Sequence, residues 1–132
     1  METNIKFIGK VDSILTSLEE CPLQESENAP AAMITIFPEF ITGIQHITEG
    51  TDLLLFTWLH KANRTVLACQ PRNNPSAPLT GVFATRSPDR PNPIGIHEVK
   101  VLAVSPDGVI AVSGLEALDQ TPVIDIKPVI RR

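Results

Sequence analysis

The sequence predicts a small all-β domain, a barrel or sandwich with one short helix outside it. Apolar residues fall in eight short runs that are rich in Val, Ile, Phe and Thr and are bounded by Pro, Gly, Asn or Asp, as strands are. The whole chain, residues 1–132, fits one domain without an internal repeat or linker. The alternating helices that a doubly wound α/β fold requires are missing. The predicted strands are 4–11, 32–37, 53–59, 65–70, 81–85, 97–104, 109–114 and 122–126.

One short helix is predicted between the second and third strands. Glu39 follows Pro38 at its start, and Gly50 lies just beyond its end, where a glycine commonly terminates a helix. Four apolar side chains recur at helical spacing in this segment. They are Phe40, Ile41, Ile44 and Ile47.

The connections between the strands are of two kinds. The strands 97–104 and 109–114 are separated by the sequence SPDG, which predicts a hairpin turn. The segments 20–31 and 70–80 lack any periodicity and are rich in proline, so we expect long loops there. Long loops in a compact domain often carry function.

The charge of the chain is unevenly distributed. The net charge of −4 argues against a general nucleic-acid binder. Residues 60–100, however, hold six basic and two acidic residues, whereas residues 1–59 hold two basic and nine acidic ones. Such a basic stretch can contact phosphates, unless its charges point to several different faces. The candidates for RNA contacts are Arg64, Arg72 and Arg90.

Several classes of protein are not expected. Cys21 and Cys69 are far apart, and the three histidines have no metal-ligand spacing, so no metal site is predicted. The first twenty residues do not resemble a secretory signal, and no apolar run approaches the roughly 20 residues of a membrane span. We therefore expect a cytoplasmic protein without a membrane partner. Because GxGxxG, P-loop and GxSxG patterns are missing, a Rossmann cofactor site is not expected either.

The densest motif is GVFATRSPDRPNPIG at 81–95, where a predicted strand runs into a proline-rich loop. Proline restricts its own backbone and that of the preceding residue, so the loop is stiff before any ligand binds. It holds Arg86 and Arg90, whose planar guanidinium groups suit a carboxylate or a phosphate. The alternative is a surface loop whose two arginines are solvated.

Two further segments carry polar side chains near predicted strands. Glu116, Asp119 and Asp125 lie in GLEALDQTPVIDIKP at 114–128, where carboxylates can bind hydroxyl groups, balance a positive charge or accept a proton. The alternative is that each of them caps a turn or lies on a strand edge. His60 and Lys61 follow an apolar strand, although a lone histidine can equally be structural.

The motifs at 81–95 and 114–128 together resemble the TrmO/TsaA family, and IFPEF at 36–40 and PLQ at 22–24 support the resemblance. It covers residues 4–128. The resemblance implies a β-barrel unrelated to the Rossmann methyltransferases, a homodimer, and S-adenosylmethionine as the cofactor. It also implies methylation of the exocyclic nitrogen of threonylcarbamoyl-adenosine beside the anticodon of tRNA.

The family's site residues carry over to matching positions of this sequence. Asp119 or Asp125 is the candidate for taking the proton that the acceptor nitrogen must lose. The cofactor-binding residues implied by the resemblance are Gln24, Glu25, Ser26, His60, Lys61, Arg86, Ile96, Leu115, Glu116, Leu118 and Asp119.

The chain departs from the family pattern at four positions. Leu23 replaces the arginine of PRQ, and Gln120 replaces the glycine of DGTP. Asp52 stands where a histidine is usual, and Val129 follows DIKP in place of tyrosine. These departures leave two alternatives open. One is a methyltransferase of the same fold with another small acceptor, and the other is a non-catalytic S-adenosylmethionine-binding protein.

Overall fold

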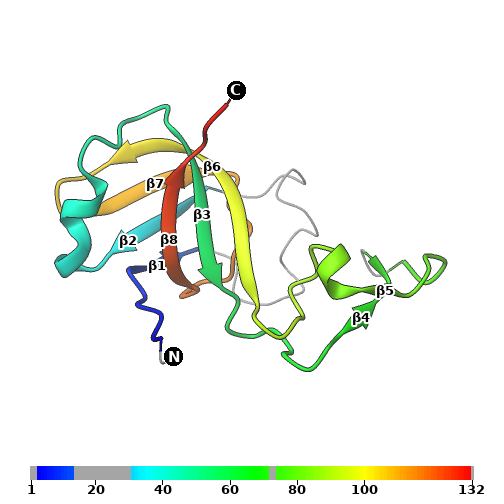
Figure 1. Cartoon of the computed structure of the whole chain (residues 1–132). Helices are drawn as coiled ribbons and strands as arrows, with labels where there is room; N and C mark the ends of the chain where they lie inside the picture. The colour runs from blue at the N-terminus through cyan, green and yellow to red at the C-terminus, as the bar shows by residue number, and fades with distance from the viewer. Residues whose placement is uncertain (1–2, 14–30, 72–73, 132) are drawn as a thin grey trace.

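Six antiparallel strands close into a barrel in the order β1-β2-β7-β6-β3-β8 (Figure 1). The computed structural model describes residues 3–13, 31–71 and 74–131. Closure pairs every strand on both sides and leaves no open sheet edge in the barrel. The predicted all-β barrel is therefore confirmed. Its strands are β1 (Gly9–Asp12), β2 (Ala32–Ile36), β3 (Asp52–Trp58), β6 (Ile94–Val104), β7 (Val109–Ser113) and β8 (Pro122–Pro128).

The core of the barrel is made by alternate residues of each strand. In β3, Leu53 and Leu55 are buried while their neighbours are half-buried, and β7 shows the same alternation. This period of two is what puts one set of side chains inside and the other outside. Fully buried members of the core include Val11, Ile34, Leu55, Val101, Ile110, Val112 and Val123.

The helix predicted near residue 40 is present as the 3-10 helix η2 (Pro38–Ile44). It ends before Ile47, so Gly50 does not terminate it as predicted. Gly43 lowers the propensity of this segment for an α-helix. Phe40, Ile41 and Ile44 pack against the core. In Figure 1, η2 lies on the side of the barrel away from β4 and β5.

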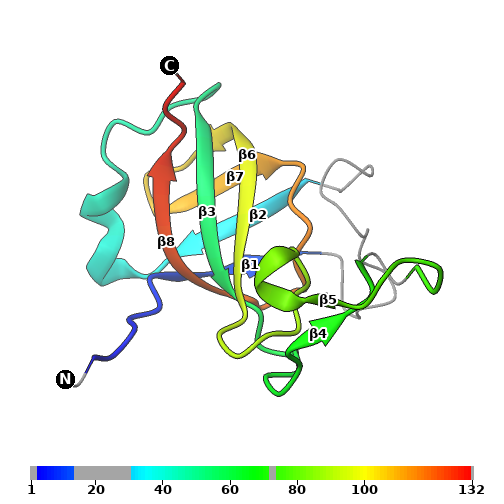
Figure 2. The same cartoon turned by 45° about the vertical axis from the view of Figure 1, so that its right-hand side comes forward.

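A two-stranded arm projects from the barrel, and Figures 1 and 2 show it from two directions. It pairs β4 (Ala68–Cys69) with β5 (Thr80–Gly81). The prediction of a strand over 65–70 is therefore correct for two residues only. In the described part of the chain, no helix is long and apolar enough to span a membrane.

The predicted strand 81–85 is wrong beyond its first residue, because Val82–Ala84 form the 3-10 helix η4. The reason is the side chain of Arg90. Its guanidinium takes the place of a neighbouring strand, because it donates hydrogen bonds to the carbonyl oxygens of Val82 and Thr85 at 2.8 and 2.6 Å. Satisfied in this way, these carbonyls need no strand partner. Two other boundaries also differ: β1 begins at Gly9 rather than at residue 4, and β6 begins three residues before 97.

Candidate functional site

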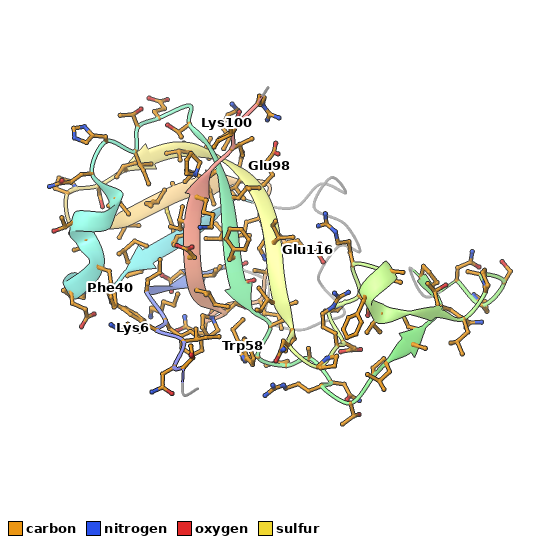
Figure 3. The ribbon with its side chains drawn as sticks, in the orientation of Figure 1. Lys6, Phe40, Trp58, Glu98, Lys100 and Glu116 are labelled. Atoms are coloured by element: carbon orange, nitrogen blue, oxygen red, sulfur yellow. The ribbon has the colours of Figure 1, made fainter. Side chains whose placement is uncertain are left out.

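A cavity of about 640 Å³ lies beside the end of the barrel that bears the arm. Figure 3 shows Glu116 on the side of the barrel that faces η4. Four segments of the chain that are distant in sequence line this cavity: the segment after β3, the proline-rich loop, the start of β6, and the segment before β8. The lining residues are Leu59–Ala62, Phe83, Thr85–Arg90, Ile94–His97, Glu116–Leu118 and Thr121.

The start of β6 supplies the barrel's wall of the cavity. Ile94 and Ile96 are 44% and 40% exposed and form an apolar surface there. His97 is buried, and its Nε2 lies 2.8 Å from Oγ1 of the fully buried Thr57 on the neighbouring strand. A β-carbon on Gly95 would lie only 2.6 Å from Thr57 Oγ1 and 2.8 Å from His97 Nε2, so this hydrogen bond requires glycine.

The segment after β3 brings His60 and Lys61 to the cavity. It is fastened to the proline-rich loop, because the Leu59 N–H donates to the Pro93 carbonyl and the Asn63 N–H donates to Asp89 Oδ1, both at 2.8 Å. Partial desolvation, and then the adjacent Lys61 ammonium, lower the pKa of His60. The imidazole is therefore mostly neutral at pH 7.

Arg64 strengthens the same connection. Its Nε donates to the Pro91 carbonyl at 2.7 Å and its Nη2 donates to Asn92 Oδ1 at 3.3 Å. Its guanidinium also lies 5.1 Å from the centre of the Trp58 ring, within the range of a cation–π contact. Arg64 was predicted to contact RNA, but these contacts direct its donors toward the protein's own loop.

The two arginines of the proline-rich loop have different surroundings. Arg90 donates to three main-chain carbonyls, those of Val82, Thr85 and Ser87, at 2.6–2.8 Å. It is a structural residue of the loop, although it also lines the cavity. Arg86 lines the cavity with an exposed side chain. Of the two predicted receivers of an anion, the structure therefore favours Arg86.

The carboxylates predicted in 114–128 are separated by the fold. Glu116 lines the cavity, whereas Asp119 and Asp125 do not. Asp125 Oδ2 pairs with the Lys127 ammonium at 3.3 Å, and its Oδ1 accepts the Ile126 N–H. Asp119 Oδ1 accepts a hydrogen bond from the Ser13 N–H at 2.9 Å. This hydrogen bond is the main cause of the lowered pKa of Asp119. A lowered pKa makes Asp119 a weaker base than an ordinary carboxylate.

The other predicted residues differ in their position relative to the cavity. Leu118 and Ile96 line the cavity, whereas Leu115 is fully buried in the barrel core and does not. Gln24, Glu25, Ser26 and Arg72 lie outside the described residues. Within the described residues, no three His, Cys, Asp or Glu side chains gather to hold a metal ion.

The lining residues that were not singled out from the sequence include Gly95, His97 and Phe83. Gly95 and His97 lie two residues apart in a strand, a spacing that puts both on the same face of the barrel wall. Phe83 stands inside the 81–95 motif and is 79% exposed, which is unusual for a phenylalanine. The period of β6 could have identified the first two, but the exposure of Phe83 depends on the turn to η4.

Asp119 yields a prediction about pH. The pKa of Asp119 in the folded protein lies below the ordinary value of 3.8, so the hydrogen bond from Ser13 stabilises the fold above about pH 3.8. That contribution is lost as the pH falls through the folded pKa. We expect Asp119→Asn to lower the melting temperature at pH 7. The gap in melting temperature between the variant and the wild type should become smaller as the pH falls. A gap that stays constant from pH 7 to the acid unfolding limit would contradict this assignment.

Comparison with known proteins places the chain in a family. A model described as the tRNA-methyltransferase O N-terminal domain matches residues 10–132. A protein of Archaeoglobus fulgidus, described as a probable S-adenosyl-L-methionine-binding protein, is 42% identical over 129 residues, covering 97% of this chain and 34% of that relative. A protein of Methanothermobacter thermautotrophicus with the same description is 38% identical over 128 residues, covering 97% of this chain and 90% of that relative.

The solved structures agree with the sequence comparisons. TrmO from Pseudomonas aeruginosa aligns with 98% of this chain at 28% identity and a TM-score of 0.76. The chain spans 55% of that protein and 34% of the Archaeoglobus relative. The resemblance inferred from the motifs at 81–95 and 114–128 is thereby confirmed. With a family model that matches from Lys10 to the end and a barrel of the same fold, the chain belongs to the family of the tRNA-methyltransferase O N-terminal domain.

Proposed function

We propose that this chain binds S-adenosylmethionine in the cavity and transfers its methyl group to the exocyclic nitrogen of threonylcarbamoyl-adenosine in tRNA. One observation carries the proposal. Residues that the family resemblance assigns to the cofactor come from all four segments that line the cavity, and the fold brings them together there. They are His60, Lys61, Arg86, Ile96, Glu116 and Leu118.

The side chains around the cavity suit the chemistry of this cofactor. Lys61 and Arg86 can bind its carboxylate, because both offer hydrogen-bond donors on a positively charged group. Ile94, Ile96 and Phe83 offer an apolar surface for its adenine ring. A volume of about 640 Å³ lies within the range of roughly 300–1,000 Å³ that is common for small-molecule sites.

When bound, S-adenosylmethionine supplies a methyl group that is already activated on a positively charged sulfur. The work of the protein is to hold donor and acceptor in line and to exclude water. The carboxylate of Glu116 lines the cavity, where it can balance positive charge. We assign the uptake of the acceptor's proton to Glu116 rather than to Asp119 or Asp125, since only Glu116 of the three lines the cavity.

The tRNA acceptor is supported by the description of the family and of TrmO. Such a reaction would take place in the cytoplasm. Its test is incubation of the protein with S-adenosylmethionine and bulk tRNA from cells that lack their own enzyme, followed by mass spectrometry of the nucleosides. We expect threonylcarbamoyl-adenosine to gain one methyl group.

Calorimetry with S-adenosylmethionine separates the alternatives. Cofactor binding without a methylated nucleoside would favour another small acceptor or a non-catalytic binding protein. The absence of cofactor binding would refute all three candidate functions, because each of them requires S-adenosylmethionine to bind.

We also propose that the chain acts as a homodimer. The arm and η4 carry Leu67, Leu79 and Phe83, which are 66%, 73% and 79% exposed. Apolar side chains grouped in this way commonly mark an interface, and a second copy is the simplest partner. Light scattering should give twice the mass of 14.4 kDa at micromolar concentration. Leu79→Glu should shift that mass toward the monomer, and a wild-type monomer would refute the proposal.

A further inference from the structure

The turn that precedes β8 contains a residue in an unfavourable backbone conformation. Gln120 has a φ of +69°, in the left-handed region that residues with a β-carbon rarely adopt. It is an exposed residue, so burial of its side chain does not hold it there. Conformations of this kind persist where the surrounding contacts enforce them, and they gather at functional sites.

The contacts that hold Gln120 come mainly from β1. Its side-chain Oε1 accepts a hydrogen bond from Lys10 Nζ at 3.2 Å, and its Nε2 donates to Asp12 Oδ1 at 3.1 Å. Its main-chain N–H donates to the Val11 carbonyl at 2.6 Å. The Asp12 carboxylate is itself fixed, because its other oxygen accepts the Thr35 hydroxyl at 2.7 Å. The amide of Gln120 therefore fits a donor and an acceptor that β1 and β2 hold in place.

The same turn forms part of the cavity. Leu118 and Thr121 flank the strained residue and both line the cavity. They are tied to each other, since the Thr121 hydroxyl donates to the Leu118 carbonyl at 2.7 Å. Between them, Asp119 accepts the Ser13 N–H and also a hydrogen bond from Gln120 Nε2 at 3.3 Å. A shift of Gln120 would thus move the cavity wall and the end of β1 together.

We infer that Gln120 is a positioning residue, whose side-chain amide fixes the turn 118–121 to β1 and so fixes the wall of the cofactor cavity. A glycine, which the family motif has at this position, would adopt the same backbone conformation without strain. It could make none of the three side-chain contacts. This chain therefore holds the turn with side-chain hydrogen bonds that a glycine at position 120 could not make. The inference rests on the proposed function, because the ligand of the wall is taken to be S-adenosylmethionine.

The test first removes the hydrogen bond from Gln120 to Asp12 and then restores it with donor and acceptor exchanged. Gln120→Glu keeps the size of the side chain but turns the donor to Asp12 into a carboxylate, which Asp12 and Asp119 repel. Adding Asp12→Asn restores a donor–acceptor pair and the wild-type net charge, and the asparagine oxygen can still accept from Thr35. Gln45→Glu is the matched control, because Gln45 is exposed and directly follows η2. This helix lies on the side of the barrel away from β4 and β5 (Figure 1).

Affinity for S-adenosylmethionine and the melting temperature are measured for all four proteins. We expect Gln120→Glu to weaken binding about tenfold, which corresponds to about 1.4 kcal/mol, with little change in melting temperature. The double variant should bind within about threefold of the wild type, and Gln45→Glu should bind like the wild type. Unchanged binding in Gln120→Glu, or a double variant that stays as weak as the single one, would overturn the inference.

A second measurement needs no ligand and keeps the inference separate from the proposed function. Hydrogen exchange of the Ser13 and Thr121 amides reports on the turn directly, because these amides donate to Asp119 and Leu118. We expect both to exchange faster in Gln120→Glu and to recover in the double variant. If the wild type failed to bind S-adenosylmethionine, the proposed function would fall, while these exchange rates would still decide the role of Gln120. Equal exchange rates in wild type and Gln120→Glu would contradict that role.

Discussion

Arg90→Ala is expected to lower the free energy of unfolding by about 3 kcal/mol, since it removes a charged donor from three main-chain carbonyls at once. For a chain of this size, that corresponds to a fall in melting temperature of about 10 °C. Cofactor binding should weaken as well, because Phe83 and Arg86 stand on the loop that these bonds shape. Arg90→Lys should recover little, because one ammonium cannot reproduce the planar fork that spans the three carbonyls.

Arg86→Ala is the matched control for this result. The Arg86 side chain is exposed and lines the cavity, so its removal should leave the melting temperature within about 1 °C of the wild type. Its effect should appear in the affinity for S-adenosylmethionine, because the proposed bidentate partner of the carboxylate is lost. Thermal melts and calorimetry on both variants decide the matter. If Arg90→Ala melted like the wild type and Arg86→Ala did not, the roles given to the two arginines would have to be exchanged.

Gly95→Ala is expected to cost about 2 kcal/mol of stability and to disturb the cavity wall, because the added methyl group has no room. Its carbon would lie 2.6 Å from Thr57 Oγ1 and 2.8 Å from His97 Nε2, so the hydrogen bond between those two side chains would have to break or shift. Denaturant unfolding measures the loss. A shifted imidazole resonance of His97 in an NMR spectrum would show where the strain goes.

Two further variants control the result at Gly95. Gly43→Ala introduces the same methyl group where no atom lies within 4 Å, inside η2, and should be neutral or slightly stabilising. Adding Thr57→Ala to Gly95→Ala removes the nearest atom, so the second change should cost less than Thr57→Ala costs in the wild type. Strictly additive effects would mean that the two residues do not meet.

Several features of the fold and the site could be predicted from the sequence because they depend on local pattern. The short apolar runs at 53–59 and 109–114 predict strands that the barrel contains with nearly the same bounds. The strand 81–85 could not be predicted correctly in the same way. Its apolar residues suit a strand, yet the guanidinium of Arg90 satisfies the carbonyls and allows a 3-10 turn.

In the candidate site, too, some features could be predicted from the sequence and others could not. Lys61 and Glu116 were singled out from motifs far apart in the sequence, and both line the cavity. Leu115 and Leu118 could not be told apart in the sequence, because the motif holds both. The backbone turns one into the core and the other toward the cavity.

By itself, the sequence determined the family, the approximate positions of the barrel strands and the segments that meet at the cavity, because these follow from short apolar runs bounded by turn residues and from two long motifs. Only the tertiary structure decided what individual side chains do. Arg86 and Arg90 are equivalent in the motif, but the loop brings three carbonyls to one of them and leaves the other at the cavity. Asp119 similarly binds the main chain at the end of β1, where it accepts a hydrogen bond from the Ser13 N–H. The physical reason is that the role of a polar group depends on the partners that already satisfy it, and folding alone brings those partners together.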